Sequence, residues 1–429
     1  MRLPTRRTPG DLPHQGRMPE AAAQAVHRMN SRERMLSAMF GRPVDRPPVA
    51  PLYLDLYLQA EVRRRVTEHY LPLLRGRGSL PLDPTHHVEV WTQAVVEAFH
   101  GLGALPDWLC WMPELPPTAW LGECVLETQG EALWRVHPPS GQRERLDPHA
   151  DPNPFGADAW DRPLPSTPEE VDRLTPLLEA EQILSSGRLA LLAGLLKRLG
   201  PTTFVAAGIG TPFPECYALL GFQGLMLMPI ENPMLFIHLL GRMQAAALAR
   251  AEAFLRLGVD GVFVEESFTS ADLISTDLYE RFVLPSTSAL VERIRDSGKP
   301  VILYMTGDVL PRLPHVLQLA PTAFAVEEPK KGYRLDLGEI AAVIGQRFAV
   351  FGNLDATRIK DWDDQGLDGE LQVQYDAGQA ALGFIFSTGS PLPLDTPRER
   401  VAAFVRRAQA IRSADHTAQR GIRRQGRSP

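Results

Sequence analysis

The sequence predicts a parallel (β/α)8 barrel, and two features of its 429 residues favour this fold class. From about residue 200, short apolar segments rich in β-branched residues alternate with segments of helical periodicity. Continuous apolar segments are typical of strands buried on both faces, as in a parallel sheet. Six strand–helix units in succession, with room upstream for two more, favour a closed barrel with right-handed crossovers. An open doubly wound sheet is the alternative, and the absence of a GxGxxG motif after an early strand disfavours it.

Each predicted strand ends in polar residues, and amphipathic helices are expected between the strands. In one of these helices, Leu278, Phe282 and Leu290 recur at helical spacing, and Gly298 is expected to end it. The predicted strands are residues 203–212, 261–267, 300–308, 323–329, 348–356 and 383–390. The predicted helices are residues 31–40, 231–256, 277–297, 366–381 and 397–412.

The first half of the sequence is less regular. Residues 47–57 are predicted to form the first barrel strand. Residues 105–165 are rich in Pro, Trp and Asp and are expected to form an irregular insertion. Within this region, residues 124–139 alternate in polarity around Gly130, which predicts an inserted β-hairpin.

Composition limits the domain organisation and the surroundings of the protein. Residues 1–29 are expected to form a flexible arm, residues 30–412 the barrel, and residues 413–429 a flexible basic tail. A net charge of −6 argues against a nucleic-acid or membrane surface. The sequence contains no apolar run long enough to span a bilayer and no secretory signal. The three scattered cysteines, Cys110, Cys124 and Cys216, predict no disulfide framework, so we expect a cytoplasmic protein.

Polar side chains collect where the predicted strands end. In a barrel these ends converge on one mouth, where active sites lie. The expected catalytic residues are Glu266, Tyr304, Asp308, Glu328 and Asp355. The expected substrate-binding residues are Tyr53, Asp55, Tyr57, Glu265, Thr306, Glu327, Asn353, Thr388 and Ser390.

These carboxylates predict an acidic pocket that binds a cation or a cationic substrate, or that transfers a proton. Strand alternation restricts the set, because at most one residue of each adjacent glutamate pair can face the barrel axis. Tyr53, Asp55 and Tyr57 would share one face of the first strand. The alternative interpretation is that the carboxylates cap downstream helices, or pair with Lys330, Lys331 and Arg334.

Several segments together resemble the uroporphyrinogen decarboxylase-like superfamily, which includes the decarboxylase itself and zinc-dependent methyltransferases acting on methylated corrinoid proteins. The resemblance covers most of residues 31–412, except 105–165, and implies a (β/α)8 barrel. It is carried by SRERMLSAMFGRPVDRPPVAP (31–51), GTPFPECYALLGFQGLMLM (210–228), GVFVEESFTSADLISTDLYERFVLP (261–285), VILYMTGDV (301–309), GNLDA (352–356) and GFIFSTGSPLPLDTPRERVAAFV (383–404).

The resemblance also implies a zinc site in the methyltransferase branch, formed by a His-x-Cys and a later Cys. Tyr304, Thr306 and Ser390 stand at the corresponding positions here, so we expect that the usual zinc site is lost and that no cofactor is bound. A hard cation held by carboxylates stays an alternative. The decarboxylase branch uses an arginine-rich segment after the first strand and a late histidine, and residues 51–60 and 386–391 contain neither.

The resemblance therefore leaves three hypotheses open. The first is a diverged methyltransferase-branch enzyme that acts on a small polar or methylated substrate, with a corrinoid protein as an implied partner. The second is a decarboxylase, for which Arg46, Lys330, Lys331 and Arg358 would supply positive charge. The third is a non-catalytic binding protein on the same barrel. The family implies a monomer or a homodimer, and a small-molecule substrate is expected without nucleic acid or membrane.

Overall fold

A parallel sheet of seven strands forms the centre of the structure, a computed structural model that describes residues 29–149, 164–330 and 332–412. The predicted arm, the predicted tail and residues 150–163 of the predicted insertion lie outside the described residues, apart from Met29 of the arm. The seven strands are β2 (Trp108–Trp111), β6 (Phe204–Gly210), β7 (Gly261–Glu266), β8 (Val301–Met305), β9 (Ala323–Val326), β10 (Ala349–Phe351) and β11 (Phe384–Ile385).

The sheet order is β11-β10-β9-β8-β7-β6-β2, and all the pairs are parallel. Its two edges approach the same segment near Val49. A parallel bridge joins Val49 to Phe386 beside β11. On the other side, the Asp107 N–H donates a hydrogen bond to the Val49 carbonyl at 2.6 Å, directly before β2. The sheet is therefore curled, and one short segment lies between its edges.

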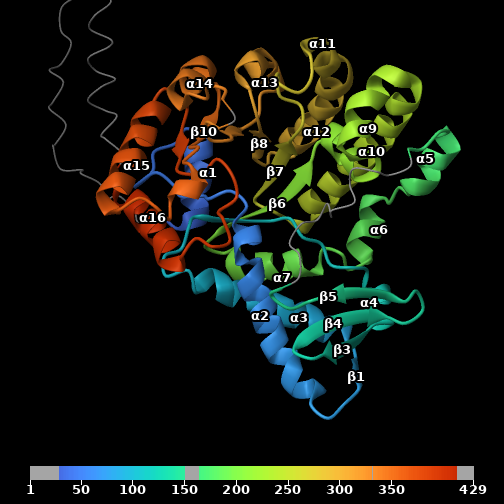
Figure 1. The fold of residues 1–429 in the computed structure, drawn as a ribbon. Coiled ribbons are helices and arrows are strands. Elements are labelled where there is room, and N and C mark those ends of the chain that lie inside the picture. Colours follow the sequence, from blue (N-terminus) through green and yellow to red (C-terminus); the bar gives the residue numbers. More distant parts are fainter. Residues whose placement is uncertain (1–28, 150–163, 331, 413–429) are drawn as a thin grey trace, which may run out of the picture.

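Helices surround this sheet (Figure 1). Those that follow or connect its strands are α7 (Ala190–Leu199), α8 (Pro212–Glu215), α9 (Tyr217–Glu231), α10 (Pro233–Leu257), α11 (Thr276–Leu278), α12 (Leu284–Asp296), α13 (Leu313–Leu319), α14 (Leu337–Ile344), α15 (Asp364–Gly378) and α16 (Arg398–Ala410). Two further helices precede α7 in the sequence, α5 (Pro168–Leu174) and α6 (Ala180–Ser185). A π-helical turn, Tyr279–Val283, joins α11 to α12 inside the single helix predicted over 277–297.

Helix α1 (Ser31–Met39) closes the end of the sheet where its strands begin. Its Met35 and Met39 are buried in the apolar cluster inside the curled sheet. Arg32 pairs with Asp260 at 2.6 Å, immediately before β7. A Cβ atom at Gly383 would lie 2.0 Å from the Ala38 carbonyl oxygen, so the helix backbone touches the start of β11. The opposite end of the sheet is left for the site.

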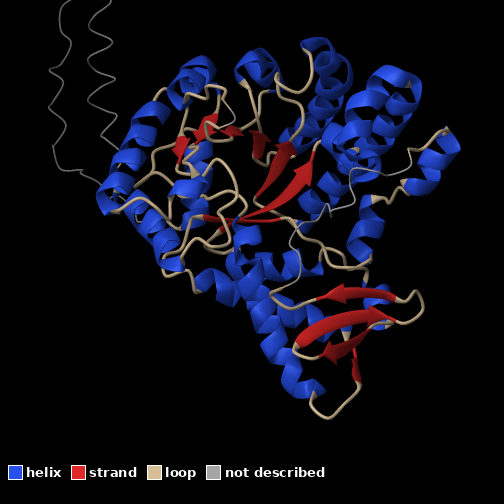
Figure 2. Ribbon diagram, viewed as in Figure 1, coloured by secondary structure: helices blue, strands red, loops and turns tan. Residues whose placement is uncertain are grey.

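A second, antiparallel sheet lies beside the first (Figure 2). Its strands are β1 (Ser79–Pro81), β3 (Val125–Gln129), β4 (Ala132–His137) and β5 (Gln142–Arg145), in the order β1-β3-β4-β5. It packs beside α2 (Leu54–Leu74), α3 (Pro84–His100) and α4 (Thr118–Gly122). Strands β3 and β4 form an antiparallel hairpin around the positive-φ Gly130, as the alternation within 124–139 predicts.

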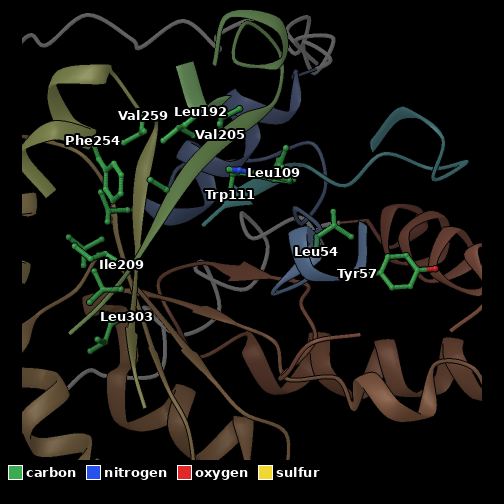
Figure 3. Close-up of a cluster of buried hydrophobic side chains, with 14 of the residues drawn as sticks. Leu54, Tyr57, Leu109, Trp111, Leu192, Val205, Ile209, Phe254, Val259 and Leu303 are labelled. Atoms are coloured by element: carbon green, nitrogen blue, oxygen red, sulfur yellow. The ribbon is translucent and has the colours of Figure 1, made fainter. Parts of the chain in front are cut away.

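Side chains on the strands divide between two apolar clusters. Those that point outward, such as Val205, Ile209 and Leu303, pack against the helices (Figure 3). Those that point inward, such as Phe263 and Tyr304, fill the interior of the curled sheet with Trp108, which is fully buried. Burying the outward set stabilises the fold by roughly 1.5–3 kcal/mol per large side chain.

The structure corrects two predictions for the first half. Residues 47–57 do not form one strand, because only the part around Val49 is extended and α2 begins at Leu54. The mixture of Leu, Tyr and Asp in this stretch alternates like a strand but also suits an amphipathic helix. Residues 105–165 are not wholly an insertion either, since β2 within them belongs to the central sheet.

Candidate active site

Two adjacent glutamates at the end of β7 point in opposite directions. Phe263 lies inside the curled sheet and Val264 outside it, so the two-residue period directs Glu265 inward and Glu266 outward. Glu265 is half-buried at the C-terminal end of the sheet. We call the group of polar side chains at this end the mouth, and define it by Asp55, Glu265, Tyr304, Glu327, Glu328, Lys330 and Ser390.

Tyr304 stands at the centre of the mouth. Its ring stacks on Phe263 at 5.6 Å between centroids and meets the edge of Tyr53 at 5.7 Å. Its hydroxyl donates a hydrogen bond to the Gly389 carbonyl at 2.8 Å. Burial, followed by the negative charges of Glu327 and other carboxylates, raises its pKa well above the ordinary value for tyrosine. The hydroxyl therefore remains a neutral hydrogen-bond donor at physiological pH.

An ion-paired cluster forms one side of the mouth. The Lys330 ammonium lies 2.9 Å from a Glu327 oxygen and 3.0 Å from a Glu328 oxygen. The Tyr333 hydroxyl donates to Glu327 at 2.7 Å, as does the Gly307 N–H at 3.0 Å. Burial opposes ionisation of Glu327, but these donors outweigh it and lower the pKa of that carboxyl. Glu327 is thus a stable carboxylate.

Glu328 is held from two sides. The Ser390 hydroxyl donates to its Oε1 atom at 2.6 Å, and the Lys330 ammonium reaches the same oxygen. Its Oε2 atom is buried without a hydrogen-bond partner among the described residues. A buried carboxylate oxygen left without a donor is costly, so this atom is a candidate contact for a ligand.

A different carboxyl, Asp55, lies on the other side of the mouth. Its residue is fully buried, and the Met112 N–H donates to its Oδ2 atom at a long 3.4 Å. The Oδ1 atom has no partner among the residues described. Burial, opposed by only a few backbone hydrogen bonds, raises the pKa of Asp55 to about 7. Such a group can give or take a proton near neutral pH.

Glu265 shares this environment. Burial raises its pKa, although the hydroxyls of Ser267 and Tyr53 favour the ionised form. The Ser267 hydroxyl donates to Glu265 at 2.6 Å. Tyr53 adopts a left-handed backbone conformation with φ of 53°, which is strained for a residue with a Cβ atom. This turn brings Tyr53 and Asp55 to the mouth although they do not lie on a strand.

Glu266 is the main correction to the predicted catalytic set, because the expectation that it reaches the mouth is wrong. It is fully buried on the outer face of β7. It accepts hydrogen bonds from the Thr287 hydroxyl at 2.6 Å and from the Tyr279 hydroxyl at 2.8 Å. Its position therefore ties β7 to the π-helical turn and α12.

Because Glu266 points away from the mouth, substituting it should affect the stability of the protein and not its catalytic rate. Glu266→Ala should lower the free energy of unfolding by about 3 kcal/mol, since it leaves a cavity and unpaired hydroxyls. Glu266→Gln, which keeps the shape and most hydrogen bonds, should retain activity within about twofold, because no reacting group is changed. Denaturant unfolding and a rate assay of both variants test this; a large loss of activity in a stably folded Glu266→Gln would contradict it.

The other predicted site residues mostly serve the framework. Tyr57 lies on α2 and donates to the Thr396 carbonyl at 2.7 Å, so its predicted place on a strand face shared with Tyr53 is wrong. Thr388 accepts from the Leu52 N–H at 3.1 Å.

Two polar residues after β10 have local partners. The Asn353 amide donates to the Glu327 carbonyl at 3.1 Å and supports the ion-paired cluster. Asp355 caps the short helix Ala356–Arg358 by accepting from the Thr357 N–H at 3.0 Å, as the capping alternative predicts.

The residues that directly follow β8 make backbone contacts. Thr306 and Asp308 are half-buried there, and the Asp308 N–H donates to Asp272 at 3.0 Å. A Cβ atom at Gly307 would lie 2.3 Å from the Ser270 hydroxyl, which explains why glycine stands between them. The carboxylates of Glu266 and Asp355 thus have local partners, the cited contact of Asp308 is made by its backbone, and we place the site around Asp55, Glu265 and Tyr304.

Sequence reasoning missed the contribution of Tyr333 and Met112. Both lie in irregular segments, and each contacts a mouth carboxyl only because of the tertiary fold. The position of Met112 directly after the apolar WLCW segment is the one available signal, since it marks the end of an unrecognised strand.

The side chains at the expected zinc positions do not fit a site of nitrogen and sulfur ligands. The Tyr304 hydroxyl is committed to Gly389 and the Ser390 hydroxyl to Glu328. The described part of the chain has no group of three or more His, Cys, Asp or Glu side chains arranged to hold a metal ion. The expectation that no cofactor is bound stays a prediction.

Comparison with known proteins gives the family. The family model described as uroporphyrinogen decarboxylase (URO-D) matches residues 148–411, which is more than half of the chain. This chain belongs to the uroporphyrinogen decarboxylase family. The resemblance seen in the sequence segments is thereby confirmed.

Members of this family with two activities are similar to the chain at low identity. A uroporphyrinogen decarboxylase of Anaeromyxobacter dehalogenans is 27% identical over 202 residues, covering 46% of this chain and 56% of that protein. The methylcobamide:CoM methyltransferase MtaA of Methanosarcina barkeri is 25% identical over 247 residues, covering 56% of this chain and 65% of that protein. The chain spans less than two thirds of the length of these relatives.

A solved structure supports the fold over most of the chain. A methyltransferase from Methanosarcina mazei superposes with a TM-score of 0.59 at 18% identity, covering 89% of this chain and 99% of that chain. At this identity the likeness supports the fold alone. Among the helices that the structure describes, none is both long and apolar enough to cross a bilayer.

Proposed function

We propose that this chain is a methyltransferase-branch enzyme of the uroporphyrinogen decarboxylase family, which binds a small polar or methylated substrate in the mouth. One observation carries the proposal: two carboxyls with raised pKa values, Asp55 and Glu265, share the mouth with an ion-paired carboxylate, Glu327. Environments that separate the pKa values of neighbouring carboxyls are typical of acid–base chemistry.

The charge of the mouth favours a neutral or cationic substrate over a polyacid. Lys330 is the one cation among its defining residues, and two glutamates already neutralise it. Arg46, a candidate for binding substrate carboxylates, pairs with Asp107 at 2.7 Å at the opposite end of the sheet. Arg358 stacks on Trp362 at 4.9 Å. A substrate with several carboxylates would therefore meet uncompensated negative charge.

The residues support methyl transfer without zinc in the following way. A carboxylate form of Glu265 or Asp55 takes the proton from the N–H or S–H group of the acceptor. The freed electron pair forms a bond to the methyl carbon, and the bond between that carbon and its donor breaks toward the donor. The Tyr304 hydroxyl donates to the Gly389 carbonyl, and its oxygen can accept a hydrogen bond from the N–H or S–H group of the acceptor.

We infer that the sheet closes as a (β/α)8 barrel, with the segment around Val49 as the eighth strand between β11 and β2. The name of the related MtaA protein specifies a methylcobamide as methyl donor, and we propose a methylated corrinoid as donor here as well.

A transfer assay tests the proposed reaction. The protein is incubated with methylcobalamin and a panel of small amines and thiols, and methylated products are measured by mass spectrometry. Glu265→Gln should lower the rate by about 10²-fold or more, because a proton acceptor is removed. Glu231→Gln is the matched control: it removes the same charge from the exposed end of α9 and should leave the rate unchanged.

Two results would contradict the proposal. Loss of carboxyl groups from a uroporphyrinogen substrate, without methyl transfer, would assign the decarboxylase reaction instead. One zinc ion bound tightly per chain in elemental analysis would show that hydroxyl and carboxylate groups do hold the metal, against the fit described above.

A further inference from the structure

A cavity lies outside the mouth, where the antiparallel sheet meets the segment that follows β2. Its volume is about 490 Å³, and it is lined among others by Glu114, Trp120, Arg135, Glu144 and Arg188. All of these except Arg188 precede residue 148, where the family match begins. The cavity therefore lies mainly in a part of the chain that the family model does not match.

Arg135 is a buried cation in the wall of this cavity. Its residue is 3% exposed, and one end of its guanidinium pairs with Glu144 from the neighbouring strand β5. The carbon at the centre of the guanidinium lies 5.4 Å from the centre of the Trp120 ring. Its Nε atom is buried and has no hydrogen-bond partner among the described residues.

His87 supports Arg135 from behind. Its Nε2 atom lies 3.1 Å from the indole nitrogen of Trp91 and 3.4 Å from an Arg135 nitrogen. Burial, followed by the charge of Arg135, lowers the pKa of His87 to about 3. The imidazole is therefore neutral and accepts at Nε2, which fixes Arg135 without adding positive charge.

Arg188 provides a second guanidinium, and no acidic side chain in the described chain pairs with it. Its Nε atom is also buried without a partner. The two carboxylates in the lining are already engaged, since Glu144 pairs with Arg135 and Glu114 lies 3.0 Å from Arg250. The uncompensated charge in the cavity is thus positive.

We propose that this cavity is a binding site for a small oxyanion group, the phosphate or carboxylate of a ligand, held by Arg135 and Arg188. A buried N–H group without an acceptor costs free energy, and Arg135 and Arg188 each bring one such group to the lining of this cavity. Guanidinium groups match the geometry of carboxylate and phosphate oxygens, so they bind an oxyanion more strongly than a neutral acceptor.

Calorimetric titration of the full chain with inorganic phosphate and, separately, with succinate tests this site and distinguishes the two oxyanions. Arg188→Gln should weaken binding about tenfold or more, since a charge-assisted hydrogen bond is lost. Glu144→Gln should tighten binding severalfold, because it frees Arg135 from its carboxylate partner. Arg173→Gln is the matched control on α5, where Arg173 is 74% exposed and outside the cavity, and should bind like the original protein.

Circular dichroism reports whether each variant is folded. Arg188→Lys is a second variant that keeps the positive charge. The Arg188→Lys protein should bind the anion with intermediate affinity, because an ammonium keeps the attraction but loses the forked geometry of the guanidinium. The proposal is overturned if neither anion binds, which would mean that water satisfies the cavity. It is also overturned if folded Arg188→Gln and Glu144→Gln both bind with unchanged affinity.

Discussion

Asp55→Asn is expected to remove most of the activity while making the protein more stable at pH 8. The activity should fall by about 10²–10⁴-fold, the range contributed by a positioned acid–base group. The amide cannot exchange a proton near neutral pH, whereas the carboxyl of Asp55, with a pKa of about 7, can. The pH–rate profile of the original protein should bend near pH 7, and a variant with residual activity should lose that bend.

The gain in stability follows from the direction of the pKa shift. Burial raises the folded-state pKa of Asp55 from 3.8 to about 7, so the folded protein keeps a proton that the unfolded chain releases. The free energy of unfolding therefore falls as the pH rises from about 4 to about 7, and the full loss caused by ionising buried Asp55 is present above pH 7. At 1.36 kcal/mol per pKa unit, this cost is on the order of 4 kcal/mol.

Denaturant unfolding between pH 4 and pH 8 measures the effect. The difference between Asp55→Asn and the original protein should be small at pH 4 and largest at pH 8. Asp296→Asn, at an exposed position near the end of α12, is the matched control and should change stability by less than about 0.5 kcal/mol at either pH. Equal stability of Asp55→Asn and the original protein at pH 8 would show that Asp55 is not a buried acid.

Gly389→Ala is expected to disrupt the mouth from its other side. A Cβ atom at this position would lie 2.2 Å from the Glu328 backbone nitrogen and 2.5 Å from its Oε2 atom. Backbone cannot move aside as a flexible side chain can, so the strand ends must separate. The same movement displaces the Gly389 carbonyl, which accepts a hydrogen bond from the Tyr304 hydroxyl. It also displaces the Ser390 hydroxyl, which donates a hydrogen bond to Glu328. We expect a loss of about 3 kcal/mol of stability, the upper part of the range for overpacking.

Gly369→Ala provides the control for the added methyl group. Gly369 lies within α15, and nothing would contact its Cβ atom within 4 Å. Alanine there should raise stability by about 0.5–1 kcal/mol, because it favours the helix. Unfolding curves of the two variants should therefore shift in opposite directions. A Gly389→Ala variant as stable as the original protein would mean that β9 and the 386–391 segment are not packed as described.

The sequence predicted the units of the central sheet with useful accuracy where the pattern was regular. All six strands expected from residue 203 onward are present. They could be predicted because continuous apolar segments are recognisable without knowing their neighbours in the fold. Strand β2 was missed since its four residues, WLCW, stand in a region rich in proline and aspartate. The sequence predicts a strand around Asp55, but a short mixed segment suits either period, and a left-handed turn at Tyr53 decides for the helix.

The sequence by itself determined that polar groups would gather at the ends of the strands, because strand–helix repetition brings those ends together. Only the tertiary structure decided which groups meet. It turned Glu265 inward and Glu266 outward, placed Lys330 between two glutamates, and buried Asp55 where its pKa rises. The physical reason is that the direction of a side chain and its desolvation depend on neighbours far away in the sequence, which local patterns do not contain.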